Sequence, residues 1–245
     1  MSTQISRWLL VAIVLVSGVR CSTPEKSTLC FVSTLTETEG SQTRVFTFVY
    51  EFSRLKSITL SEGGTTTVTT YLYDDKGNVG GSTKVSGSAV VEEGSYSYDK
   101  QNKLQAATLI GTDYETTIQY SYNDNGQLVS EVETTLSGAG DVLISRAYTY
   151  PDILTKNPSM ITTTVSGNAP DQLELEYDNK IAPLRNLFPT TKAANNVVKE
   201  TYLNGTTLVE TTYSITYQYN AEGYPVSAVS TSGKTQTWVY DCREI

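Results

Sequence analysis

The sequence predicts an all-β protein in which antiparallel β-hairpins repeat as a meander and form a strongly curved sheet, or an open or closed barrel. Three observations support this fold class. The chain of 245 residues contains 17 tyrosines and is rich in threonine, and both residue types favour strands. A tyrosine-containing pattern recurs along the chain. After residue 21, no apolar pattern keeps the 3.6-residue period of a helix.

The first 20 residues are typical of a secretory signal peptide. Arg7 precedes an unbroken apolar run from Trp8 to Val16, which is too short for a spanning helix of about 20 apolar residues. The alternative is a buried N-terminal helix or strand of the fold. We assign residues 1–20 to the signal peptide, 21–29 to a polar tether and 30–245 to a single β-repeat domain.

The repeated unit has the pattern of a β-hairpin. A large apolar residue, any residue and Tyr lead into a polar turn and then an aliphatic residue, as in the segment from Tyr71 to Val79. Asp and Asn side chains stabilise such turns, and Gly supplies the positive φ. The second Tyr of each unit falls at positions 50, 73, 98, 122, 150, 177, 219 and 240, and the first unit lacks the turn Gly. Two strands per unit give about 14–16 strands, and a sheet of that width curls or closes.

The paired tyrosines are the candidate ligand-facing residues. Side chains two apart on a strand share a face, so each pair presents two rings together. Facing outward, the rings can stack on sugars or aromatic ligands; facing inward, they form the core, and this is the interpretation that we favour. The candidates are Tyr71, Tyr73, Tyr96, Tyr98, Tyr120, Tyr122, Tyr148, Tyr150, Tyr217 and Tyr219.

One segment interrupts the repeat between Tyr177 and Tyr219. The stretch Asn179–Pro189 contains two prolines and an apolar cluster, which indicates a short helix or an ordered loop, not a strand. Two hypotheses remain: a plug in the mouth of the curved sheet, or a loop that caps an edge or an apolar end of it. We favour the cap.

The three cysteines divide into an anchor candidate and a pair. Cys21 directly follows the apolar run, while Cys30 and Cys242 lie at the two ends of the mature domain. In an oxidising compartment these two can form a disulfide that closes a loop of about 210 residues. The alternative is two separate small hydrophobic residues.

The composition excludes several classes of function. The chain has no histidine and a net charge of −8, which argues against nucleic-acid binding, histidine-dependent nucleophilic catalysis and the usual zinc sites. The repeated acids, such as Asp74 and Asp124, stand where turns require them. The segments around them match no twelve-residue calcium loop. We therefore expect no catalytic residue, no metal and no cofactor.

The hairpin pattern resembles the YD repeats of large bacterial Rhs-type proteins, and it is more similar to small Bacteroidetes-type lipoproteins with a porin-like domain of unknown function. The segments that carry this resemblance are, in order, Cys30, the Tyr-Asp-x-x-Gly-Asn hairpins, Tyr177–Lys180, Pro183-Leu184, Asn195–Val197 and Tyr219–Pro225. The resemblance implies a porin-like fold and brings no catalytic residues. Cys21 resembles a lipid-attachment cysteine, although Gly18 and Arg20 stand where that signal has Leu and a small residue.

The sequence thus favours a non-enzymatic bacterial lipoprotein of the cell envelope with a binding or structural role. Its expected partners are the outer membrane, reached through lipid on Cys21, and a glycan or protein. The alternatives are a secreted hydrolase that uses carboxylates on glycans and a surface adhesin. Cleavage by the ordinary signal peptidase would instead release a soluble secreted form.

Overall fold

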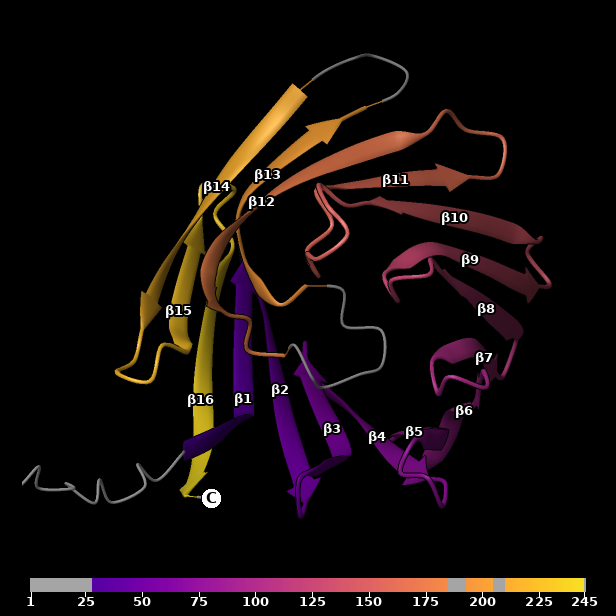
Figure 1. The fold of residues 1–245 in the computed structure, drawn as a ribbon. Coiled ribbons are helices and arrows are strands. Elements are labelled where there is room, and N and C mark those ends of the chain that lie inside the picture. Colours follow the sequence, from indigo (N-terminus) through magenta and orange to yellow (C-terminus); the bar gives the residue numbers. More distant parts are fainter. Residues whose placement is uncertain (1–27, 185–192, 205–209, 245) are drawn as a thin grey trace, which may run out of the picture.

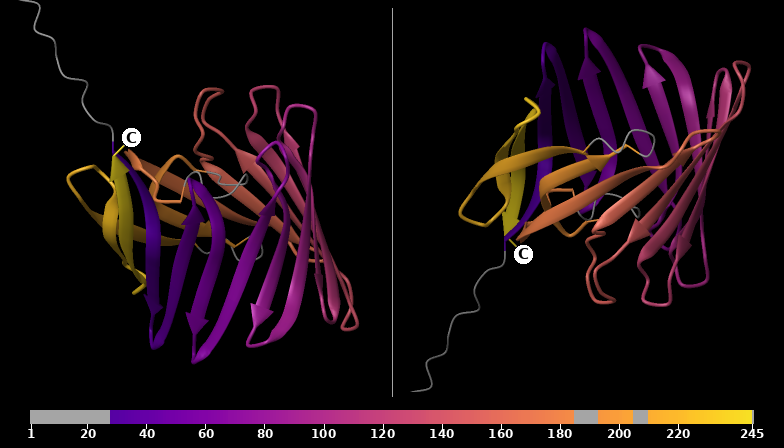
Figure 2. Two further views of the ribbon diagram at one scale, coloured as in Figure 1. Left: turned by 90° about the horizontal axis from the view of Figure 1, so that it is seen from below. Right: turned by 90° about the horizontal axis from the view of Figure 1, so that it is seen from above.

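The computed structural model describes residues 28–184, 193–204 and 210–244, which form a closed antiparallel β-barrel (Figure 1). Within these residues each of sixteen strands pairs with the next along the chain, and β1 pairs with β16 to close the ring. Figure 2 shows the barrel wall from two further sides. The strands are β1 (Thr28–Glu39), β2 (Gln42–Glu51), β3 (Arg54–Glu62), β4 (Thr65–Tyr73), β5 (Val79–Ser86), β6 (Ala89–Tyr98), β7 (Leu104–Gly111), β8 (Tyr114–Tyr122), β9 (Leu128–Ser137), β10 (Val142–Thr149), β11 (Met160–Val165), β12 (Asp171–Ile181), β13 (Asn195–Leu203), β14 (Glu210–Tyr219), β15 (Pro225–Ser230) and β16 (Thr235–Glu244).

This architecture confirms the predicted meander, and the barrel is closed. Among the described residues, no helix is long and apolar enough to cross a membrane.

The hairpin turns of the repeat are built from local hydrogen bonds. In the turn between β4 and β5, the Asp74 carboxylate accepts the backbone N–H groups of Lys76 at 2.9 Å and Asn78 at 2.8 Å. Gly77 adopts a positive φ of 84°, which costs glycine little. Asp99, Asn123 and Asn220 accept the equivalent backbone bonds in their own turns.

The turn of the first repeat unit, between β2 and β3, has Phe52 where several other units have glycine. Phe52 takes the left-handed conformation, with φ of 59°, and its side chain is 89% exposed. A residue with a Cβ is strained in this region of φ/ψ space. The missing glycine noted in the sequence therefore leaves a strained position at the tip of the β2–β3 turn.

A β-bulge accompanies the second tyrosine of most units. Tyr73 lies opposite Val79, whereas the preceding Leu72 lies opposite Gly81, so Gly80 is the extra residue. Bulges increase the local twist of the strand. They also place two buried side chains three residues apart on the returning strand, here Val79 and Ser82.

The hydrophobic core lies on the inner face of the wall, around the seam between β1 and β16. Val32, Leu35, Phe48, Leu55 and Trp238 are each at most 6% exposed and pack together with Ala228. These side chains come from both ends of the chain. The core therefore forms when the barrel closes.

The segment that interrupts the repeat differs in part from the prediction that Asn179–Pro189 contains no strand. Strand β12 continues to Ile181, so the first three residues of the stretch Asn179–Pro189 are strand and not loop. The Ala182 N–H then donates to the Ala194 carbonyl at 3.0 Å, which extends the β12–β13 pairing by one bond. Leu184 packs against the core cluster, and residues 185–189 lie outside the described part of the chain.

Candidate functional site

The candidate tyrosines lie on the luminal face of the barrel wall. The pair in β4 illustrates this: Tyr71 packs against the core cluster, while the intervening Leu72 is 63% exposed on the outer face. Eight of the ten lie within strands at positions two apart, namely Tyr71, Tyr73, Tyr96, Tyr98, Tyr120, Tyr122, Tyr217 and Tyr219. Tyr148 lies within β10, and Tyr150 directly follows that strand. The inward orientation that we favoured from the sequence is therefore the one observed.

Many of these hydroxyls donate hydrogen bonds to backbone carbonyls of the barrel wall itself. Tyr73 donates to the Leu55 carbonyl at 2.7 Å, and Tyr98 donates to the Val79 carbonyl at 3.1 Å. Both acceptors lie on the preceding strand, next to a bulge, where the regular ladder is interrupted. The same bond recurs from Tyr150 to Leu128, Tyr177 to Pro158, Tyr217 to Val197 and Tyr240 to Pro225. Their rings consequently line the lumen while their hydroxyls hold neighbouring strands together.

Burial makes these phenols hard to ionise. It raises the pKa of Tyr50 and of Tyr217 to about 12, because a phenolate loses hydration in the lumen. For Tyr71 and Tyr120, burial again raises the pKa, and nearby tyrosines and glutamates add to the effect. The phenols of these luminal tyrosines are therefore neutral over the ordinary pH range.

A cavity of about 710 Å³ lies inside the barrel, against β1 and β13–β16. Its apolar lining includes Leu35, Ile215, Ala228 and Trp238, and Leu184 lines it as well. Four aromatic rings face this space, and they form two ring pairs. Tyr217 and Trp238 are stacked with centroids 6.2 Å apart, and Tyr202 and Tyr213 meet edge to face at 5.9 Å.

The polar lining of the cavity is acidic. In the described part of the chain, Glu37, Glu39 and Glu200 line it, together with Lys234. The Glu37 carboxylate accepts from Gln236 at 2.5 Å and lies 3.2 Å from the Lys234 ammonium. The Glu200 carboxylate accepts the Tyr202 hydroxyl at 3.3 Å.

Trp238 contributes an unused hydrogen-bond donor. Its side chain is 6% exposed, and its indole N–H is the buried side-chain polar group without a partner among the described residues. A buried donor without a partner costs free energy. Trp238 also lines the cavity.

A second charged cluster lies in the lumen, on β9 and β10. The Arg146 guanidinium contacts Glu131 at 2.7 Å and Glu133 at 3.0 Å, and the Tyr148 hydroxyl donates to Glu131 at 3.2 Å. Burial opposes the charge of Arg146, yet the two carboxylates raise its pKa. Both carboxylates are thus bound by one cation, and they do not face each other across an open space.

The outer face of the wall carries many polar side chains, and Val68, Val85 and Val90 form an apolar row on it across β4, β5 and β6. Other exposed apolar side chains lie beside polar neighbours on the adjacent strands. Ile110 stands between Glu93 and Glu115, and Val239 lies opposite Thr34. On β1, β2 and β4 the outward positions include Thr34, Thr36, Thr38, Thr43, Thr47, Thr66 and Thr70.

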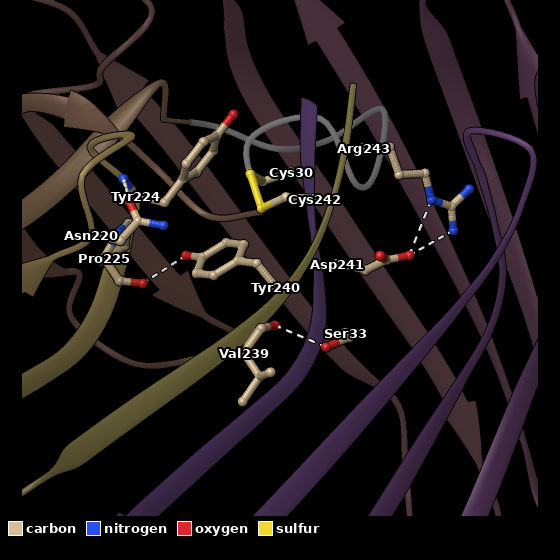
Figure 3. Close-up of a disulfide and its surroundings, with 10 residues drawn as sticks. All are labelled: Cys30, Ser33, Asn220, Tyr224, Pro225, Val239, Tyr240, Asp241, Cys242 and Arg243. Atoms are coloured by element: carbon tan, nitrogen blue, oxygen red, sulfur yellow. Dashed lines mark hydrogen bonds and ion pairs between the residues drawn. A yellow bond between two sulfur atoms is a disulfide. The ribbon is translucent and has the colours of Figure 1, made fainter. Parts of the chain in front are cut away.

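A disulfide joins Cys30 and Cys242 across the seam, with their Cα atoms 4.0 Å apart (Figure 3). The two residues are direct cross-strand partners in β1 and β16. Beside them, the Ser33 hydroxyl donates to the Val239 carbonyl at 3.1 Å at a bulge in β1. The bond thus links the first and last strands of the barrel.

The remaining predicted sites are of two kinds. Cys21 lies outside the described residues. The turn acids, such as Asp74 and Asp99, are engaged by turn N–H groups. In the described part of the chain, no cluster of three or more cysteine or acidic side chains is arranged to hold a metal ion.

Sequence reasoning named Tyr217 as a candidate but missed the other aromatic residues that line the cavity. Trp238 occupies the position of the first tyrosine in the last unit, Trp238-Val239-Tyr240, so the repeat itself could have identified it. Tyr202, Tyr213 and Glu200 lie outside the repeated pattern. For them the sequence carries no comparable signal.

The comparisons with known proteins identify the fold. No protein-family model matches the chain, and no curated protein does either. A solved structure of a porin-like protein from Bacteroides uniformis ATCC 8492 is similar, with a TM-score of 0.59 and 15% identity over 86% of this chain and 98% of that one. A second porin-like protein, from Bacteroides vulgatus ATCC 8482, matches with a TM-score of 0.45 and 12% identity over the same shares. At the level of fold, the first match agrees with the porin-like domain that the sequence resembles.

Proposed function

We propose that this protein is a non-enzymatic binding barrel of the bacterial cell envelope that stands in water and holds a small ligand in its lumen. The observation that carries the proposal is the orientation of the wall. The side chains of the core cluster face the lumen beside groups of charged residues, and threonine, serine and charged side chains cover much of the outer face. A membrane-spanning barrel instead carries a continuous apolar band on its outer face.

The charged residues of the outer face support this proposal most directly. Glu93 and Glu115 are outward positions on β6 and β8, and Glu176 on β12 bonds to Lys199 on β13 at 2.7 Å. Charges on a lipid-facing surface would be destabilising, whereas in water they are ordinary.

The envelope location is supported by the signal-like residues 1–20 and by the resemblance to envelope lipoproteins. Lipid on Cys21 would hold the acidic domain at the membrane through hydrocarbon chains, with polar residues as a tether. Such an anchor is compatible with a barrel that does not itself enter the bilayer.

The non-enzymatic role is supported by the state of the carboxylates. Glu37 and Glu200 in the cavity, and Glu131 and Glu133 beside Arg146, all have hydrogen-bonded or ionic partners. The hydrolase alternative needs one carboxyl as acid and a second as base or nucleophile across the substrate.

The test uses the full chain carrying Cys21→Ser and compares its state of aggregation with and without detergent. We expect a monodisperse protein in plain buffer and no conductance steps when it is added to planar bilayers. The variant Glu115→Val, which makes the outer face more apolar, should lower its solubility. Stable channel currents, or aggregation of the Cys21→Ser protein unless detergent is present, would contradict the proposal.

A further inference from the structure

We infer that the luminal cavity binds a small organic cation, one with an apolar or aromatic body and one hydrogen-bond acceptor. This inference rests on the proposed function and specifies the class of ligand. It follows from three features of the cavity lining: the aromatic rings, the balance of charge, and the unused donor on Trp238.

The aromatic rings provide surfaces for an ammonium group. Tyr202, Tyr213, Tyr217 and Trp238 all line the same cavity. Cations are attracted to the faces of such rings, most strongly to Trp, and sites for quaternary ammonium ligands are built in this way. The same rings accommodate an apolar body by burying it from water.

The charges of the lining favour a cation over an anion. Among the residues that the structure describes, three carboxylates, Glu37, Glu39 and Glu200, face the cavity against one ammonium, Lys234. Beside Glu37, its cross-strand partner Arg44 bonds to Glu62 at 2.7 Å, and this pair adds no net charge. A cationic ligand would thus meet an excess of negative charge in a partly enclosed space, where Coulomb interactions are less screened than in water.

The orphaned N–H of Trp238 adds a requirement for an acceptor. It is buried, it belongs to a residue that lines the cavity, and it has no partner among the described residues. A carbonyl or ether oxygen on the ligand would satisfy it. An ester of an amino alcohol with an aromatic acid combines all three features.

The experiment uses isothermal titration calorimetry on the full chain with three probes. Benzoylcholine has the cation, the ring and the carbonyl acceptor. Its neutral isostere, 3,3-dimethylbutyl benzoate, lacks the charge, and benzyltrimethylammonium lacks the acceptor. We expect benzoylcholine to bind about tenfold more tightly than either of the other two.

Three variants assign the binding to the cavity. Glu200→Gln keeps an acceptor for the Tyr202 hydroxyl and should weaken benzoylcholine about tenfold without affecting the neutral isostere. Trp238→Phe keeps an aromatic ring but removes the N–H donor, so it should weaken benzoylcholine more than it weakens benzyltrimethylammonium. Glu115→Gln removes the same charge from the outer face and should change nothing. Circular dichroism and thermal unfolding confirm that each variant is folded.

The outcomes separate this inference from the proposed function. Equal binding of benzoylcholine and its neutral isostere, unaffected by Glu200→Gln, would overturn the cation assignment and leave a luminal binding barrel in place. Absence of binding by all three probes would overturn the assignment as well, while the behaviour of the barrel in plain buffer and in bilayers decides the proposed function independently.

Discussion

Removing the Cys30–Cys242 disulfide should destabilise the barrel without altering its fold. The bond joins residues separated by 212 positions, and its partners are the first and last strands of the meander. In the native barrel these residues face each other across the β1–β16 pairing. The double variant Cys30→Ala/Cys242→Ala therefore breaks few native contacts and acts chiefly on the unfolded chain.

The magnitude follows from the length of the closed loop. For a loop of this size the loop-entropy model gives about 5 kcal/mol of stabilisation. A domain of this length changes its Tm by about 2–4 °C per kcal/mol, so the loss corresponds to about 10–20 °C. Because the unfolded chain also becomes less compact, the slope of the urea transition should increase.

The assay is urea unfolding followed by circular dichroism on the oxidised protein, the reduced protein and the double variant. The reduced protein and the double variant should share a midpoint well below that of the oxidised protein. Cys21→Ser is the control and should unfold like the unchanged chain. An unchanged midpoint after reduction would refute the reasoning, because it would mean that the bond does not restrain the unfolded state.

Three further predictions concern the repeat. Phe52→Gly relieves the left-handed backbone strain at an exposed turn. After the entropy cost of glycine is subtracted, the variant should be about 0.5–1 kcal/mol more stable in urea unfolding. A loss of stability would contradict this. Tyr73→Phe removes the hydroxyl that satisfies the Leu55 carbonyl and should cost about 1 kcal/mol, and an unchanged midpoint would show that water replaces the bond. Burial raises the pKa of Tyr50 and Tyr217 to about 12 from 10.0. The unfolded chain therefore loses these protons first, so the stabilisation is fully present below about pH 10 and is lost between about pH 10 and 12. Ultraviolet titration of the phenols should show ionisation that coincides with unfolding. A rise in stability over this pH range would refute the prediction.

The envelope prediction is tested at the mature N-terminus. Mass spectrometry should find a lipid-modified Cys21 in membrane fractions. An unmodified N-terminus downstream of Cys21 would replace the anchor with soluble secretion, without affecting the proposed binding in the lumen.

The local structure of this barrel could be predicted from the sequence because its causes are local. The turn of Asp74 and Gly77 closes through bonds between residues at most four apart. The two-residue period of a strand places Tyr71 and Tyr73 on one face wherever that strand lies. The repetition of these units then implies a long meander, and its width implies strong curvature.

The site depended on contacts between distant parts of the chain. Leu35 meets Trp238, and Glu37 meets Lys234, because β1 and β16 pair. No local pattern specifies that pairing, and the same hairpins are compatible with an open sheet. The sequence favoured the tyrosine face as the inner one but could not fix that choice, since tyrosine suits a buried surface and a solvated one. The sequence by itself determined the hairpins and their turns through short-range hydrogen bonds and the period of the strand. The tertiary structure alone decided the closure, the face that became the lumen and the composition of the cavity, because those depend on which strands far apart in the sequence bury their side chains against one another.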